Sequence, residues 1–265
     1  SLLAAGVALA LQIGCNLAND YSDGVRGTDD ERTGPPRLTA SEAVPPRVVK
    51  LAAFGCFGIG GLLGLALLAL SGQWWMLLLG AAAIAAAWFY TGGSRPYGYA
   101  GLGEAFVFVF FGLMATTGTL YVQGGSVPGW AWLAACGIGL IACSLLMVNN
   151  LRDIGTDPIH GKRTLAVRLG ERRARRVFCA MIVIPVVLFV MMAMSIVQVL
   201  KQGYESYPSS YVLIFGWGSV AVAVVAALIL TFIPWKHRPV DTHAAVAQIL
   251  ADDADDTASI EGGAK

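Results

Sequence analysis

The sequence predicts an all-α, polytopic membrane protein, and two features of its composition carry this prediction. Of the 265 residues, 56% are hydrophobic and only 13% are charged, whereas soluble domains carry about 25% charged residues. The apolar residues also fall in long runs, and about 20 consecutive apolar residues span a bilayer as a helix. The lipid bilayer is therefore an expected partner of the chain, and nucleic acid is not.

Seven segments are predicted to span the membrane. They are residues 1–19, 51–70, 74–90, 103–122, 130–149, 177–199 and 211–233. The connections between them alternate between nearly uncharged loops and longer, polar ones. Of the 18 Lys and Arg residues, Lys201 alone lies in a loop of the first kind. Because Lys and Arg concentrate in cytoplasmic loops, the polar loops are predicted to be cytoplasmic.

This topology predicts a multi-pass protein of the cell membrane (the inner or plasma membrane). It puts residue 1 on the outer face, and the chain opens with Ser rather than Met, so we expect a further helix upstream of this sequence. A transmembrane domain is expected over residues 1–239. Residues 240–265 include an acidic, Ala-rich run and are predicted to form a disordered tail. The five cysteines show no CxxC spacing and are predicted to be small core residues.

A cluster of polar residues stands at the end of the first spanning segment: Asn16, Asn19, Asp20 and Asp23. Their spacing of three and four residues places them on one face of a helix. Carboxylates this close repel one another unless a cation lies between them. Oxygen ligands suit a hard ion, and Mg²⁺ is the usual choice where phosphates also bind. The alternative is that these residues cap a helix and face solvent.

A second cluster with similar spacing stands at the end of the fifth segment: Asn149, Asn150, Asp153 and Asp157. We expect these four side chains to occupy one helical face where the helix reaches the cytoplasmic surface. Both clusters then end on the same side of the membrane, which predicts a shared site for two or more Mg²⁺ ions, with the active site facing the cytoplasm. Ionisable groups at membrane depth are costly and are by default functional.

Basic residues follow both clusters, and together with Mg²⁺ they suit the charge of a diphosphate group. Arg26, Arg32 and Arg37 follow the first cluster, and Lys162 and Arg163 follow the second. Arg37 and Lys162 could bind phosphate, or could serve only as the positive charges that mark cytoplasmic loops. The sequence supports the two roles equally.

The loop after the third spanning segment contributes further polar and aromatic residues. Glu104 is the only carboxylate close to a spanning segment apart from the two clusters. Tyr90, Tyr97 and Tyr99 could line the site or form an interfacial belt, and the belt is the favoured role for at least two of them. Arg95 lies in the same loop.

Three stretches resemble the UbiA superfamily of intramembrane prenyltransferases. They are NLANDYSDGVRGTDDERTGPPRL at 16–38, FYTGGSRPYGYAGLGEAFVFVFFG at 89–112 and NNLRDIGTDPIHGKRTLAVRLG at 149–170. The first and third look like the two Asp-rich motifs of the superfamily. The GGSRPYGYAGLGE loop and the GPPRL ending look most like its 1,4-dihydroxy-2-naphthoate polyprenyltransferase branch. The likeness covers about residues 1–235 and implies a UbiA-like helix bundle, typically of nine helices.

The resemblance also implies an activity: Mg²⁺-dependent transfer of a polyprenyl group from polyprenyl diphosphate to 1,4-dihydroxy-2-naphthoate with loss of CO₂, giving demethylmenaquinone in menaquinone biosynthesis. The implied metal ligands are Asn16, Asp20, Asp23, Asp29, Asp153 and Asp157. The implied substrate contacts are Asn19, Arg37, Tyr90, Arg95, Asn150, Lys162 and Arg163. The implied catalytic residues are Asp20, Asp23, Asp153 and Asp157.

Two other functions fit parts of the pattern. A CDP-alcohol phosphotransferase also uses Asp clusters and a divalent ion, and residues 20–24 fit the opening of its motif, but the later elements of that motif are missing from the sequence. A cation- or proton-coupled transporter would use intramembrane acids as relay sites. Transporter acids are expected near mid-membrane, however, whereas these lie at helix ends. Loss of Mg²⁺-dependent diphosphate release on changing Asp20 or Asp153 to Asn would favour the transferase.

Overall fold

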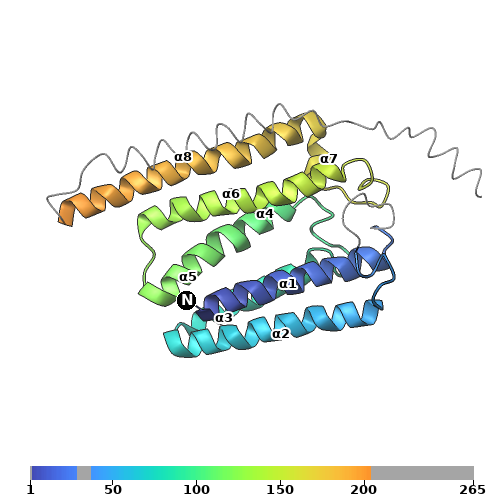
Figure 1. Ribbon diagram of the computed structural model, residues 1–265, viewed down its shortest axis with the longest axis horizontal. Coiled ribbons are helices and arrows are strands. Elements are labelled where there is room, and N and C mark those ends of the chain that lie inside the picture. The colour runs from blue at the N-terminus through green and yellow to red at the C-terminus, as the bar shows by residue number, and fades with distance from the viewer. Residues whose placement is uncertain (1, 29–36, 204–265) are drawn as a thin grey trace, which may run out of the picture. The chain divides into compact units, whose positions relative to one another are not determined.

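The computed structural model describes residues 2–28 and 37–203, and throughout these ranges the regular structure is helical (Figure 1). The helices are α1 (Leu2–Val25), α2 (Pro46–Ser71), η1 (Trp74–Met76), α3 (Leu77–Phe89), α4 (Gly103–Val107), η2 (Phe108–Met114), α5 (Ala115–Gly124), α6 (Gly129–Arg152), α7 (Leu165–Leu169) and α8 (Glu171–Gly203). The predicted all-α fold class is confirmed.

Five of the described helical stretches are long and apolar enough to cross a membrane. They are Leu2–Val25, Pro46–Ser71, Gly103–Gly124, Gly129–Arg152 and Glu171–Gln198. The predicted span at 74–90 corresponds to a shorter apolar helix, Trp74–Phe89. The predicted span at 211–233 and the predicted tail at 240–265 lie outside the described residues. Helix α7 was not predicted, because five residues are too few to show a helical period.

Sequence signals explain where the helices begin and end. Pro46 occupies the first position of α2, where its missing N–H costs nothing. Gly72 ends the same helix with a left-handed φ of +72°, a conformation that side chains disfavour. Helix α1 continues past the apolar run to Val25, so the whole first cluster lies on one helix, as predicted.

The second cluster differs from its prediction. Helix α6 ends at Arg152, Asp153 caps it, and Asp157 lies in the turns that follow. The prediction that Asn149, Asn150, Asp153 and Asp157 share one helical face is therefore wrong for Asp157. The physical reason lies in the next residues, because Gly155 weakens the helix and Pro158 cannot continue it.

Two sets of contacts between small and apolar side chains hold the helices together. Helix α1 packs against α2 through Ala18, Ala53 and Phe57, whereas α6 packs against α8 around Met147 and Met181. Where the π-helical turn η2 crosses α6, a Cβ added to Gly112 would lie only 2.4 Å from the Cα of Gly139. These glycines let the two backbones touch. The five cysteines are free thiols, and of these Cys143 is buried while the other four are half-buried.

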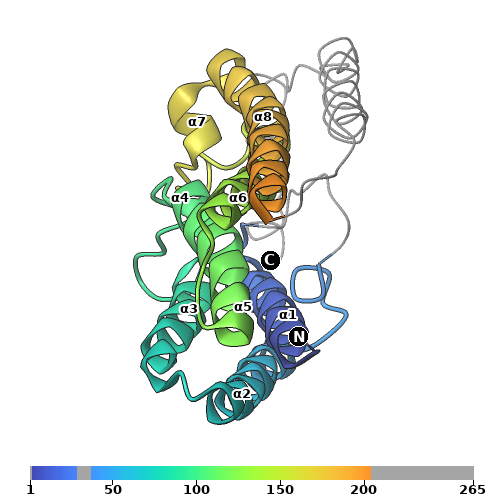
Figure 2. The ribbon, with the colours of Figure 1, turned by 90° about the vertical axis from the view of Figure 1, so that its left-hand side faces the viewer.

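Helices α1 and α6 run in the same direction, and Figures 1 and 2 show them within one bundle. Their C-terminal ends lie on the same side of Figure 1, beside α7 and the loop that connects α6 to it. Both acidic clusters therefore stand at one end of the bundle, which is the relation that the charge pattern predicted.

Candidate active site

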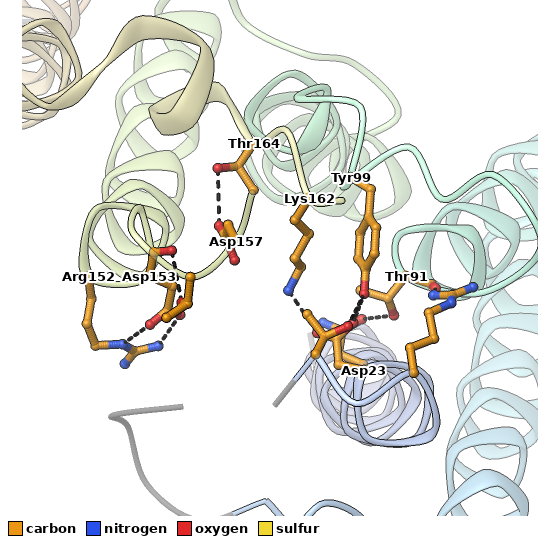
Figure 3. A network of polar contacts seen from close by, with 12 residues as sticks. Asp23, Thr91, Tyr99, Arg152, Asp153, Asp157, Lys162 and Thr164 are labelled. Atoms are coloured by element: carbon orange, nitrogen blue, oxygen red, sulfur yellow. Dashed lines mark hydrogen bonds and ion pairs between the residues drawn. The ribbon is translucent and has the colours of Figure 1, made fainter. Parts of the chain in front are cut away.

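Asp23, at the end of α1, is the point where the two acidic motifs meet (Figure 3). Its Oδ2 pairs with the Nζ of Lys162 at 3.1 Å, across 139 residues of sequence. Its Oδ1 accepts a hydrogen bond of 2.8 Å from the hydroxyl of Tyr99. The residue is 4% exposed. The first motif, the 90–102 loop and the loop after the second motif are thus tied together at a single carboxylate.

Tyr99 connects these three segments. Its hydroxyl lies 3.0 Å from the Oγ1 of Thr28, and its carbonyl accepts a hydrogen bond of 2.9 Å from the amide of Arg163. The Nζ of Lys162 lies 5.1 Å from the ring centroid and the guanidinium of Arg26 lies 5.4 Å from it, both over the ring. Burial and the charge of Asp23 raise the pKa of Tyr99, so the phenol stays protonated as a donor.

Lys162 is held in its charged form. Burial would lower the pKa of Lys162, but the carboxylates of Asp23 and Asp157 outweigh that effect and the pKa lies above its ordinary value. A buried ammonium of this kind can serve an anionic ligand at neutral pH.

Two further acids come from the end of α6. Asp153 forms a two-point ion pair with the neighbouring Arg152, with both N–O distances at 2.7 Å. Asp157 is buried and accepts a hydrogen bond of 3.3 Å from the hydroxyl of Thr164. Burial raises the pKa of Asp157 to about 6; Lys162 opposes the shift, while Asp153 and Asp23 add to it. The acids of the two motifs therefore repel one another electrostatically.

Asp20 has a different set of partners. Its two oxygens accept hydrogen bonds of 2.9 Å from the backbone amides of Leu38 and Thr39. Gly24, one turn later, lies so close to Thr39 that a Cβ would approach its side chain to 2.6 Å. These contacts fix the start of the 37–45 segment on α1, and with it the position of Arg37.

The other predicted site residues fall into two groups. Asn19 accepts a hydrogen bond of 2.9 Å from Thr91, Asn150 donates one to Glu104, and Tyr90 packs against Tyr97 with ring centroids 5.5 Å apart. The side chains of three others are exposed: Asn16, Arg95 and Arg163. Asp29 lies outside the described residues.

Several residues of this network were missed by the sequence analysis. Thr91 and Thr164 were not considered, whereas Arg26 and Tyr99 were weighed but not chosen as site residues. Arg26 donates to the carbonyl oxygens of Thr91 and Gly93, which fixes the 90–102 loop against the end of α1. Thr91 lies 72 residues from its partner Asn19, and Tyr99 lies 76 residues from its partner Asp23, so no local spacing relates them.

The acidic residues have the ligand atoms and the charge that a hard divalent cation prefers. Their ligand atoms are oxygens, they are largely buried, and their mutual repulsion would be relieved by positive charge. In the structure, Lys162 and Arg152 balance Asp23 and Asp153 instead. Over residues 2–28 and 37–203, no three acidic, His or Cys side chains are close enough together to hold a metal ion.

Comparison with known proteins places the chain in a family. The model of the UbiA prenyltransferase family matches residues 1–249. The 1,4-dihydroxy-2-naphthoate octaprenyltransferase of Mycobacterium tuberculosis is 53% identical over 72% of this chain and 66% of its own length. The enzymes of that name from Mycobacterium leprae and Escherichia coli are 50% and 44% identical, over 72% and 66% of this chain and 65% and 59% of their own lengths.

This chain therefore spans about two thirds or less of the length of these curated relatives. No solved structure matches it. The apolar helices and the family match together indicate a multi-pass membrane protein. The match decides against the CDP-alcohol phosphotransferase alternative, because the chain belongs to the UbiA prenyltransferase family.

Proposed function

We propose that this protein transfers a polyprenyl group from polyprenyl diphosphate to 1,4-dihydroxy-2-naphthoate, with loss of CO₂, to give demethylmenaquinone. The ion pair between Lys162 and Asp23 carries the proposal, because it brings the loop of one Asp-rich motif onto the carboxylate of the other. The names of the curated relatives support the same donor class and acceptor.

The diphosphate would bind where the two motifs meet, at the cytoplasmic end of the bundle. Lys162 is the buried cation best placed for it, and Arg37 and Arg163 would take further charge from the loops on either side. Buried cations recognise phosphate oxygens through charge-assisted hydrogen bonds, which are about twice as strong as neutral ones. Arg95 would contribute from the exposed rim of the 90–102 loop.

The same site would hold Mg²⁺. The proposed ligands are Asn16, Asp20, Asp23, Asp29, Asp153 and Asp157. When bound, the metal would neutralise the diphosphate and so make it a better leaving group. Asn19 and Asn150 would orient these ligands.

The residues around the acids have their own part in the reaction. Tyr99 fixes Asp23 by a hydrogen bond and shields Lys162 with its ring, which keeps both charges in one orientation. The apolar polyprenyl chain would lie among the helices, where water is excluded. An allylic cation survives only in such an environment, because water would otherwise capture it.

The direct test is an assay of the purified protein in lipid nanodiscs. Incubation with 1,4-dihydroxy-2-naphthoate, a series of prenyl diphosphates and Mg²⁺ should give a prenylated naphthoquinone detectable by mass spectrometry. Asp23→Asn and Asp153→Asn should each abolish the product, whereas Glu171→Gln, a change on the surface of α8, should not. Absence of the product with every donor would refute the proposal, and ion flux without product would favour a transporter.

A further inference from the structure

A buried carboxyl group on α4, Glu104, contacts the second Asp-rich motif through Asn150 alone among the contacts described above. Glu104 is 5% exposed. Its Oε1 accepts a hydrogen bond of 2.9 Å from the side-chain amide of Asn150. Its Oε2 is also buried, and across the described ranges no hydrogen-bond donor reaches it. A buried carboxylate oxygen without a donor is costly, and a ligand that supplies an N–H or O–H there would remove the cost.

The position of Glu104 is fixed by α6 at two points. Asn150 holds the carboxyl group, and the thiol of Cys143 donates to the backbone carbonyl of Glu104 at 3.1 Å. Asn150 precedes Asp153 by three residues, so the two lie on the same side of the last turn of α6. Oε2 is therefore held beside the second Asp-rich motif, one helical turn further into the span.

An aromatic side chain lies against Gly103, the residue that precedes Glu104. The hydroxyl of Tyr90 would lie 3.5 Å from a Cβ added to Gly103, and its ring carbon would lie 3.1 Å from it. Glycine at position 103 is what lets the tyrosine come this close to the start of α4. The buried acceptor oxygen of Glu104 and the ring of Tyr90 are thus both found at the start of α4. A hydrogen-bond acceptor together with an aromatic ring is the chemistry that recognises a phenol.

We propose that Glu104, with Asn150 and Tyr90, forms the subsite that binds a phenolic hydroxyl of the acceptor ring. This inference rests on the proposed function and specifies its acceptor half. The hydroxyl donates to Oε2 and keeps its proton, so the contact orients the ring and increases its electron density without any net proton transfer. The site of the diphosphate, one turn nearer the membrane surface, is left to the Asp-rich motifs.

Glu104→Gln is the variant that tests the subsite, because it keeps the size of the side chain and leaves an oxygen for Asn150. A hydrogen bond to a charged group corresponds to about a 10- to 100-fold change in affinity. We expect KM for 1,4-dihydroxy-2-naphthoate to rise by about that factor. Binding of an unreactive prenyl thiodiphosphate, measured calorimetrically with Mg²⁺, should stay within about twofold of the wild type. Glu171→Gln serves as the matched control and should change neither value.

Acceptor analogues separate a direct contact from a structural effect. Wild type and Glu104→Gln are compared with 1-hydroxy-2-naphthoate and with 4-hydroxy-2-naphthoate. The penalty of the variant should disappear with the analogue that lacks the hydroxyl bound by Glu104, and persist with the other. An equal penalty for all three acceptors, or an equal loss of thiodiphosphate affinity, would overturn the subsite and show that Glu104 acts on the fold.

The inference can fail separately from the proposed function. If wild-type protein makes no prenylated product, the proposed function fails, and affinity for the naphthoate is then measured through its own fluorescence. Binding that weakens about 10-fold or more in Glu104→Gln would uphold the phenol subsite. Equal binding by both proteins, or none by either, would refute it.

Discussion

The buried ion pair between Lys162 and Asp23 gives the sharpest prediction about how the two motifs are joined. Its charged atoms are 3.1 Å apart, and the side chains are 17% and 5% exposed. At an effective dielectric constant of about 20, the Coulomb attraction at that distance is about 5 kcal/mol, and desolvation offsets part of it. Removing one partner of a buried pair usually costs about 3–5 kcal/mol, because the other charge is left uncompensated.

Lys162→Met should therefore lower the free energy of unfolding by about 3 kcal/mol in metal-free protein. The double variant Lys162→Met, Asp23→Asn should lose less unfolding free energy than the two single variants lose in sum. The difference, which is the coupling energy, should be about 2 kcal/mol or more. Unfolding by SDS in mixed micelles, followed by far-UV circular dichroism, measures all four proteins. A coupling below about 0.5 kcal/mol, the value of an exposed pair, would refute the claim that this contact joins the motifs.

Three further changes test other parts of the structure. Tyr99→Phe removes the hydrogen bond to Asp23 and should cost about 1–3 kcal/mol of unfolding free energy; no loss in the same SDS titration would contradict its role. Folded Asp157 has a pKa of about 6 against 3.8 for the free side chain, so its folded form binds the proton more tightly. Its contribution to metal-free stability is full below pH 4 and lost as the pH rises to about 6, and Asp157→Asn should remove that part of the pH dependence. Gly112→Ala should cost about 1–3 kcal/mol, because its Cβ would overlap Gly139; an unchanged melting temperature would contradict that packing.

Much of the fold could be predicted from the sequence because lipid imposes simple constraints. Long apolar runs must be helical, since a bilayer satisfies no backbone hydrogen bond. The distribution of Lys and Arg then placed both acidic clusters at one end of the bundle. On α1 the spacing of Asn16 to Asp23 also predicted a single helical face, because the helix continues beyond them.

The details of the site could not be predicted in the same way. Tyr99 and Asp23 are 76 residues apart, and Asn150 and Glu104 are 46 apart, so no periodicity relates them. Whether a polar residue contacts its neighbour or a distant loop depends on packing that spacing does not encode. For Asp157 the sequence predicted a local relation that does not exist. Its helical spacing from Asp153 suggested a shared face, although the helix had already ended.

The central claim is that the end of α1 and the loop after α6 form one site, and crosslinking measures this most directly. In a background without the five native cysteines, Asp23→Cys and Lys162→Cys are paired and treated with a thiol crosslinker about 8 Å long. Ser71→Cys with Lys162→Cys is the control, because Ser71 ends α2 at the opposite end of the bundle (Figure 1). Peptide mass spectrometry should detect the crosslink between positions 23 and 162 and not between 71 and 162. Equal yields, or no crosslink between 23 and 162, would contradict the claim.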